Sequence, residues 1–190
     1  MLLYCLKKME YGSFQKALWW YLLVAVAALF GSRFTNRKFY ETLIKPSWSP
    51  RPWVFGVAWT IAYSLEAQAS YWVQRETGTF GTECWVYLAF LVVSTLWTPI
   101  FFYYKMIFLS MAVILASLGL SIAVTILYWD VYAISGAFAL VTTCWVAFAS
   151  WLNWRICNLN SSGPPTVKKE ETRTLYTSEM PFEFILSAQN

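Results

Sequence analysis

The sequence contains no histidine and few charged residues in its 190 positions. The missing histidine removes the commonest general base, the commonest zinc ligand and the usual proximal haem ligand. The cysteines at positions 5, 84, 144 and 157 show no CxxC spacing, and no glycine-rich phosphate loop is present. The sequence therefore predicts no metal site, no cofactor, no serine–histidine hydrolysis and no nucleotide-driven transport.

Apolar residues dominate what is present, with 58% hydrophobic, 20% aromatic and only 13% charged residues. A bilayer core of roughly 30 Å requires about 20 apolar residues per helix, and five stretches meet or approach that length. Because these stretches lack the alternation of a β-barrel, we predict an all-α integral membrane protein with a five-transmembrane-helix bundle. The expected spans are Ala17–Gly31, Trp53–Val73, Cys84–Tyr104, Met106–Tyr128 and Tyr132–Trp154.

The basic residues are unevenly divided between the two ends of these spans. By the positive-inside rule, the division predicts a cytosolic first loop and C-terminus, with the N-terminus across the membrane. The formal charge of +4 then reflects topology, so we expect no nucleic-acid partner. One side would carry Lys7, Lys8, Lys16 and Arg75, and the cytosolic side Arg33, Arg37, Lys38, Lys45, Arg51, Lys105, Arg155, Lys168, Lys169 and Arg173.

We divide the chain into a transmembrane domain, residues 1–159, and a polar C-terminal tail, residues 160–190. The tail contains Pro164 and Pro165 and a run of mixed charge, so we expect it to be largely disordered. The sequon at Asn160 lies on the predicted cytosolic side, where we expect no glycosylation.

Twelve tryptophans suggest two different roles. Trp59, Trp97 and Trp145 lie inside spans, where a lipid-facing helix would favour leucine, so they indicate the bundle interior or a cavity for a flat apolar ligand. Ordinary packing is the alternative. An interfacial aromatic belt is expected for those near span ends: Trp19, Trp20, Trp85, Trp129 and Trp154.

The second span carries a polar and aromatic stripe. Gly56, Trp59, Tyr63, Glu66 and Ser70 are spaced by three and four residues and therefore share one helical face. Glu66 is the only acidic residue deep in a span, and a carboxylate there is costly unless it is paired, neutralised or hydrated. We predict a protonated or hydrogen-bonded Glu66 near a polar cavity.

Two further features concern helix packing. Pro99 removes a backbone donor and should bend the third span just after Trp97. In the fourth span, small residues at positions 112, 116, 119 and 123 form a stripe that permits close helix approach. We expect this face to pack within the bundle, with a homodimer contact as the alternative.

Three segments resemble the translocator protein / tryptophan-rich sensory protein (TspO/MBR) family in that family's order. They are KPSWSPRPWVFGVAWTIAYSLEAQASYWV (Lys45–Val73), WTPIFF (Trp97–Phe102) and WVAFASWLN (Trp145–Asn153). The resemblance implies a five-helix bundle, often dimeric, with a pocket that the first loop caps and that binds porphyrins and benzodiazepine-type ligands. For eukaryotic members it implies the mitochondrial outer membrane and an association with cholesterol.

The resemblance also implies a set of ligand-binding residues. The leading function is a multi-pass membrane protein that binds porphyrin or sterol ligands, in their transport or in stress signalling. One alternative is a weak photo-oxidative porphyrin enzyme that uses Trp59 and Trp145, and another is a ligand-free membrane scaffold. By motif position the pocket would comprise Trp48, Trp53, Phe55, Trp59, Tyr63, Ser94, Trp97, Trp145, Ala149 and Leu152.

Overall fold

The structure is a computed structural model that describes residues 2–161, with side chains described from residue 14. Most of the predicted tail therefore lies outside the described residues. Within the described range every secondary-structure element is a helix, which confirms the predicted all-α class. The elements are α1 (Leu2–Phe34), α2 (Arg37–Thr42), α3 (Pro52–Thr77), α4 (Thr82–Thr98), the π-helix η1 (Pro99–Tyr103), α5 (Ile107–Val131) and α6 (Ala133–Leu159).

Four helical segments of the described residues are long and apolar enough to cross a membrane. They are Phe14–Phe34, Thr82–Tyr103, Ile107–Val131 and Ala133–Leu159. Helix α3 has 26 residues, about 39 Å at 1.5 Å per residue, but its polar side chains make it less apolar than the other four. The chain is thus a multi-pass membrane protein, and the count of five spans stays a prediction.

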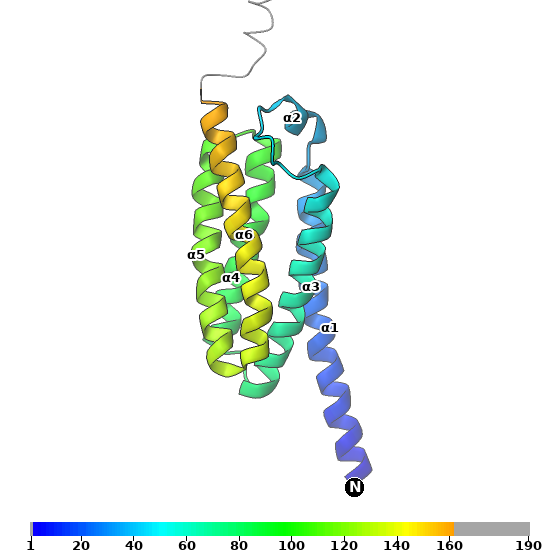
Figure 1. The fold of residues 1–190 in the computed structure, drawn as a ribbon. Coiled ribbons are helices and arrows are strands. Elements are labelled where there is room, and N and C mark those ends of the chain that lie inside the picture. Colours follow the sequence, from blue (N-terminus) through cyan, green and yellow to red (C-terminus); the bar gives the residue numbers. More distant parts are fainter. Residues whose placement is uncertain (1, 162–190) are drawn as a thin grey trace, which may run out of the picture.

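The long helices form an elongated bundle (Figure 1). Helices α5 and α6 share the most extensive contact, α4 packs on α5, α3 packs on α6, and α1 lies against α3 and α4. The buried core includes Trp20, Tyr87, Phe90, Val124 and Tyr128. Helix α2 and the segment after it lie across the end of the bundle where α6 terminates, and α1 extends beyond the opposite end.

Proline and glycine set the ends of several helices. Pro52 begins α3, where its missing N–H costs no hydrogen bond, and Gly78 ends it with a left-handed φ of 70°. The expected disturbance at Pro99 takes the form of η1, in which the Tyr104 N–H donates to the Pro99 carbonyl over 2.9 Å. The third predicted span therefore ends in a π-helical turn.

The prediction that Trp20 belongs to an interfacial aromatic belt is wrong. Four of the five tryptophans are exposed, but Trp20 has no exposed surface. Its ring stacks on Phe80 at 5.7 Å, and its indole N–H donates to Gln74 Oε1 over 3.0 Å. Because α3 supplies that acceptor, the indole does not need the headgroup region as a partner.

The stripe of small residues does not pack within the bundle, contrary to our prediction. Ala112, Ala116 and Gly119 are exposed on the outside of α5, and a Cβ added at Gly119 would meet no atom within 4 Å. A homodimer contact through this face, the alternative interpretation, stays a prediction.

The Asn160 side chain links the connection between α2 and α3 to the end of α6 through hydrogen bonds. Its side-chain carbonyl accepts from the Ile44 N–H over 3.1 Å, and its amide donates to the Ile44 and Ile156 carbonyls over 2.9 and 2.8 Å. The residue is only 7% exposed. Since the amide of this sequon is engaged in the fold, the prediction of no glycosylation gains a structural reason.

We expect Asn160→Ala to destabilise the chain by about 1–3 kcal/mol, because it leaves the Ile44 N–H and carbonyl without partners in a partly buried position. The thermal unfolding midpoint in detergent measures the effect. Ser161→Ala is the matched control, since its hydroxyl bonds only the Asn158 carbonyl at the exposed helix end. Equal midpoints for both variants would contradict the assigned role of Asn160.

Candidate functional site

A cavity of about 660 Å³ lies in the half of the bundle nearer to α2. Residues of α1, α3, α4, η1 and α6 line it, together with Arg37 and Tyr40 of α2 and Ile114 of α5. Its size falls within the range of roughly 300–1,000 Å³ that small-molecule sites occupy. The cavity is therefore the candidate functional site.

Aromatic rings form the wall of this cavity on α3, α4 and η1. Trp59 and Tyr63 of α3 lie 5.3 Å apart, one turn from each other. Trp97 of α4 stacks on Phe101 of η1 at 5.0 Å with an interplanar angle of 26°. Such ring faces suit a flat apolar ligand, because stacking requires extended π-surface and few polar partners.

The polar groups of the lining are mostly satisfied within their own helices. The hydroxyls of Ser94 and Thr95 both donate to the Leu91 carbonyl, over 3.1 and 2.6 Å. The indole N–H of Trp97 is different, because it is buried and has no partner. Because this nitrogen has almost no accessible surface, an acceptor on a ligand would reach it only after neighbouring side chains moved.

Helix α1 contributes mainly small residues to the lining, which the sequence analysis did not identify. They recur every three or four positions, so the helical period alone would have placed them on one face. At Gly31 an added Cβ would lie 3.6 Å from the Thr98 hydroxyl oxygen, an ordinary contact that leaves little free space. The α1 members of the lining are Tyr21, Val24, Ala25, Ala27, Ala28, Gly31 and Ser32.

The structure brings seven of the ten predicted ligand-binding residues together. The remaining three lie elsewhere, and their positions are described below. Asn153, which the sequence analysis also missed, lines the cavity and accepts a hydrogen bond from Ser110 over 3.2 Å. The predicted residues on the lining are Phe55, Trp59, Tyr63, Ser94, Trp97, Ala149 and Leu152.

Trp145 forms a second layer behind the cavity wall. Its ring meets Phe55 at 5.9 Å and Trp59 at 6.4 Å, the latter nearly perpendicular at 87°. Phe148 stacks on its other side, and Trp48 meets Phe148 at 5.9 Å. Trp145 thus supports the lining without belonging to it, and Trp48 lies one ring farther away.

Trp53 does not line the cavity either. It is 65% exposed at the start of α3, although the adjacent Pro52 lines the cavity. Successive positions in a helix are rotated by about 100°, so neighbours of a lining residue face other directions. Motif position predicted the segment correctly but could not select the inward-facing residues.

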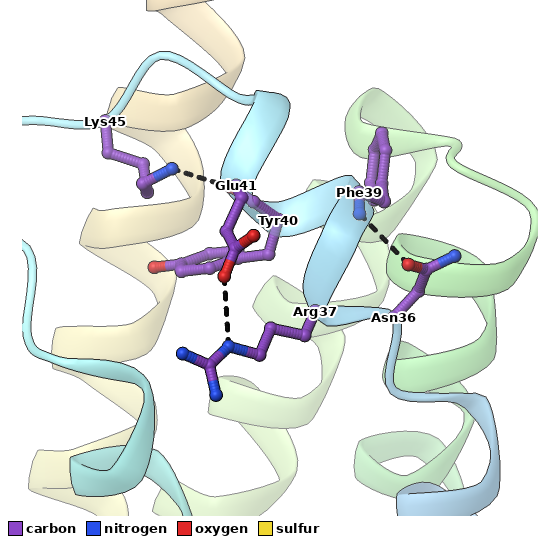
Figure 2. A network of polar contacts seen from close by, with 6 residues as sticks. All are labelled: Asn36, Arg37, Phe39, Tyr40, Glu41 and Lys45. Carbon is purple, nitrogen blue, oxygen red and sulfur yellow. Dashed lines mark hydrogen bonds and ion pairs between the residues drawn. The ribbon is translucent and has the colours of Figure 1, made fainter.

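A network of polar contacts around Tyr40 holds α2 and the segment after it (Figure 2). Asn36 caps α2 by accepting from the Phe39 N–H over 3.0 Å. Lys45 donates to the carbonyls of Tyr40 and Leu43, and the Tyr40 hydroxyl lies 3.1 Å from the Ser49 hydroxyl. Burial raises the pKa of the Tyr40 phenol and lowers the pKa of Lys45.

Glu66 lies deeper in the bundle and is not among the residues that line the cavity, so a polar cavity beside it stays a prediction. It is completely buried, near Tyr87 and Tyr128, and neither carboxyl oxygen has a hydrogen-bond partner. The nearby Thr142 hydroxyl donates instead to the Ala62 carbonyl over 3.4 Å. The polar stripe of α3 therefore divides, its first half facing the cavity and its second half the core.

Together the helices and the cavity define a multi-pass helical membrane protein with an aromatic-lined cavity that is partly open to its surroundings. Residues 20–159 match the model of the TspO/MBR family. The chain is similar to Protein CrtK of Rhodobacter capsulatus, at 34% identity over 77% of this chain and 93% of that protein. The chain belongs to the TspO/MBR family.

Two further relatives come from a bacterium and from human. The tryptophan-rich sensory protein of Cereibacter sphaeroides is 33% identical over 67% of this chain and 80% of its own length. The human translocator protein is 30% identical over 70% of this chain and 83% of its own length. The family resemblance predicted from the three segments is confirmed.

We expect Glu66→Gln to leave the thermal unfolding midpoint at neutral pH unchanged or higher, because it removes an ionisable group that has no partner in the core. Ligand affinity should stay the same, since Glu66 is not on the lining. Ser70→Ala provides the contrast: it removes the 2.7 Å hydrogen bond to the Tyr128 hydroxyl and should cost about 1–3 kcal/mol. A midpoint lower in Glu66→Gln than in Ser70→Ala would refute this account of the core.

Proposed function

We propose that this chain binds flat apolar ligands, namely porphyrins or sterols, in the cavity, and that it acts in their transport or in stress signalling. The observation that carries the proposal is a chamber of about 660 Å³ walled by aromatic rings and small residues in a TspO/MBR chain. Relatives are named translocator protein and tryptophan-rich sensory protein, names that fit movement or sensing of a bound molecule.

The wall of the cavity favours a planar ligand over a compact one. The stacked pair of Trp97 and Phe101 and the neighbouring Trp59 and Tyr63 offer ring faces, and each ring contact contributes about 0.5–1.5 kcal/mol beyond area burial. Binding would thus depend on stacking and apolar burial, with few polar contacts to orient the ligand.

The proposal includes α3 as a fifth membrane span. Its length of about 39 Å exceeds the hydrocarbon core. In its middle Glu66 and Ser70 have no exposed surface, and the partly buried Gln68 accepts a hydrogen bond from the Tyr21 hydroxyl over 3.0 Å. In this topology the first loop and the C-terminus are cytosolic, and the exposed small residues of α5 form a homodimer contact. A mitochondrial outer membrane would be its location if the chain is eukaryotic.

A second candidate function is weak photo-oxidation of bound porphyrin. The favouring observation is that Trp59 and Trp145 are ring neighbours at 6.4 Å, with Trp59 on the cavity wall. Loss of porphyrin absorbance that requires both light and oxygen, and that disappears in the Trp59→Phe/Trp145→Phe double variant, would favour the enzyme over the binding protein.

We expect protoporphyrin IX to quench tryptophan fluorescence saturably in nanodiscs, with a Kd about three- to ten-fold higher in Trp59→Phe. The increase should be smaller in Trp145→Phe, because that ring lies behind the wall. Ala149→Phe should abolish saturable quenching, since the added ring occupies the cavity that Ala149 lines.

Trp129→Phe is the control, because this ring is 49% exposed near the far end of α5 and is absent from the lining. Its Kd should equal that of the unaltered protein. Non-saturable quenching, or an identical Kd in all five proteins, would mean that the porphyrin partitions into lipid, and the cavity would lose its assigned function.

A further inference from the structure

A second, basic pocket of about 450 Å³ lies beside the mouth of the aromatic cavity. It is formed where α1 ends, where α2 begins and where η1 turns into α5. No aspartate or glutamate lines it. Four cationic side chains contribute to its wall, namely those of Arg33, Arg37, Lys38 and Lys105.

The basic pocket and the aromatic cavity share part of their walls. Thr35 and Arg37 line both of them, so the two pockets adjoin at these residues. The shared residues stand at the junction between an apolar chamber and a cationic one. This arrangement matches an amphiphile that has an apolar body and an anionic group at its edge.

The cations of the basic pocket are largely uncommitted. Arg37 pairs with Glu41 at 3.0 Å, but both side chains are mostly exposed, 76% and 58%, so the pair is weak and Arg37 can be shared (Figure 2). Among the described residues, Arg33, Lys38 and Lys105 form no ion pair. Like charges gathered without carboxylates repel one another, and an anion would relieve that repulsion.

Lys105 adds a conformational observation. Its φ of 58° makes it the one described non-glycine residue in the left-handed region, where glycine would fit without strain. Its ammonium group lies 5.7 Å from the centre of the Phe39 ring, which orients the side chain toward α2. Glycine would fit this backbone conformation with less strain, but it would not place a positive charge at the pocket as Lys105 does.

We propose that the basic pocket binds the anionic oxygen group, carboxylate or phosphate, of an amphiphile whose apolar body occupies the aromatic cavity. The proposal rests on the proposed function and narrows its ligand class to acidic molecules, such as a porphyrin with free carboxylates. Charge-assisted hydrogen bonds from arginine and lysine would fix the edge of the ligand, while stacking would hold its body.

The test compares protoporphyrin IX with its dimethyl ester, which has the same ring and no carboxylates. In neutral nanodiscs we expect the unaltered protein to bind the diacid more tightly. In Arg33→Gln/Lys105→Gln the Kd of the diacid should rise about ten-fold, while the Kd of the ester stays within about two-fold. The charge-preserving variant Arg33→Lys/Lys105→Arg should retain most of the preference for the diacid.

Lys16→Gln/Arg155→Gln is the matched control, because it removes two cations that line neither pocket. It should leave both affinities unchanged. Equal loss of diacid binding in this control, or no loss in the pocket variant, would overturn the basic pocket while leaving the aromatic cavity intact. Failure of both ligands to bind saturably would overturn the proposed function itself.

Nanodiscs with anionic lipid distinguish the source of the anion. If the ligand supplies it, the ten-fold effect of the pocket variant should persist in anionic nanodiscs. If a lipid headgroup occupies the pocket, anionic lipid should weaken diacid binding in the unaltered protein but not in the pocket variant. The first result supports the acidic ligand, and the second overturns it in favour of a headgroup.

Discussion

The bilayer restricts where α3 can lie, and much of the structure follows from that restriction. A helix that carries Glu66, Ser70 and Gln74 near its middle and end cannot expose them to acyl chains without a large cost. The fold buries Glu66 and Ser70 completely and gives Gln74 an indole donor from Trp20. Helices α1, α4, α5 and α6 therefore have to enclose the second half of α3 tightly, with Tyr87 and Tyr128 packed beside it.

Tight packing around the second half of α3 contrasts with the open first half, where its rings face the cavity. There α1 presents small residues that cannot fill the space opposite Trp59 and Tyr63. The chamber is thus a consequence of unequal side-chain size along two neighbouring helices. Asn160 and the network around Tyr40 then hold the connecting segment over the end of the bundle, where a loop without such contacts would be mobile.

Sequence alone predicted the membrane class and the family, and it named seven of the residues that line the cavity, because each of these depends on local pattern. The polar and aromatic residues of α3 do share one helical face, as predicted. Which of them face the cavity and which face the core depends on α1, and the small residues of α1 gave no sign of this role in the sequence. Trp20 was assigned to the belt because its acceptor, Gln74, lies 54 positions away. Trp145 was assigned to the wall because a motif cannot distinguish a ring that lines a cavity from one directly behind it.

Two explanations for the basic residues near the aromatic cavity, membrane topology and ligand recognition, predict different positions for them. The positive-inside rule requires only an excess of lysine and arginine on one side of the membrane, and charges spread over several loops would satisfy it equally well. The structure instead gathers Arg33, Arg37, Lys38 and Lys105 from separate segments around one pocket that no carboxylate lines. Topology does not account for this convergence or for its shared wall with an apolar chamber, whereas recognition of an acidic amphiphile accounts for both.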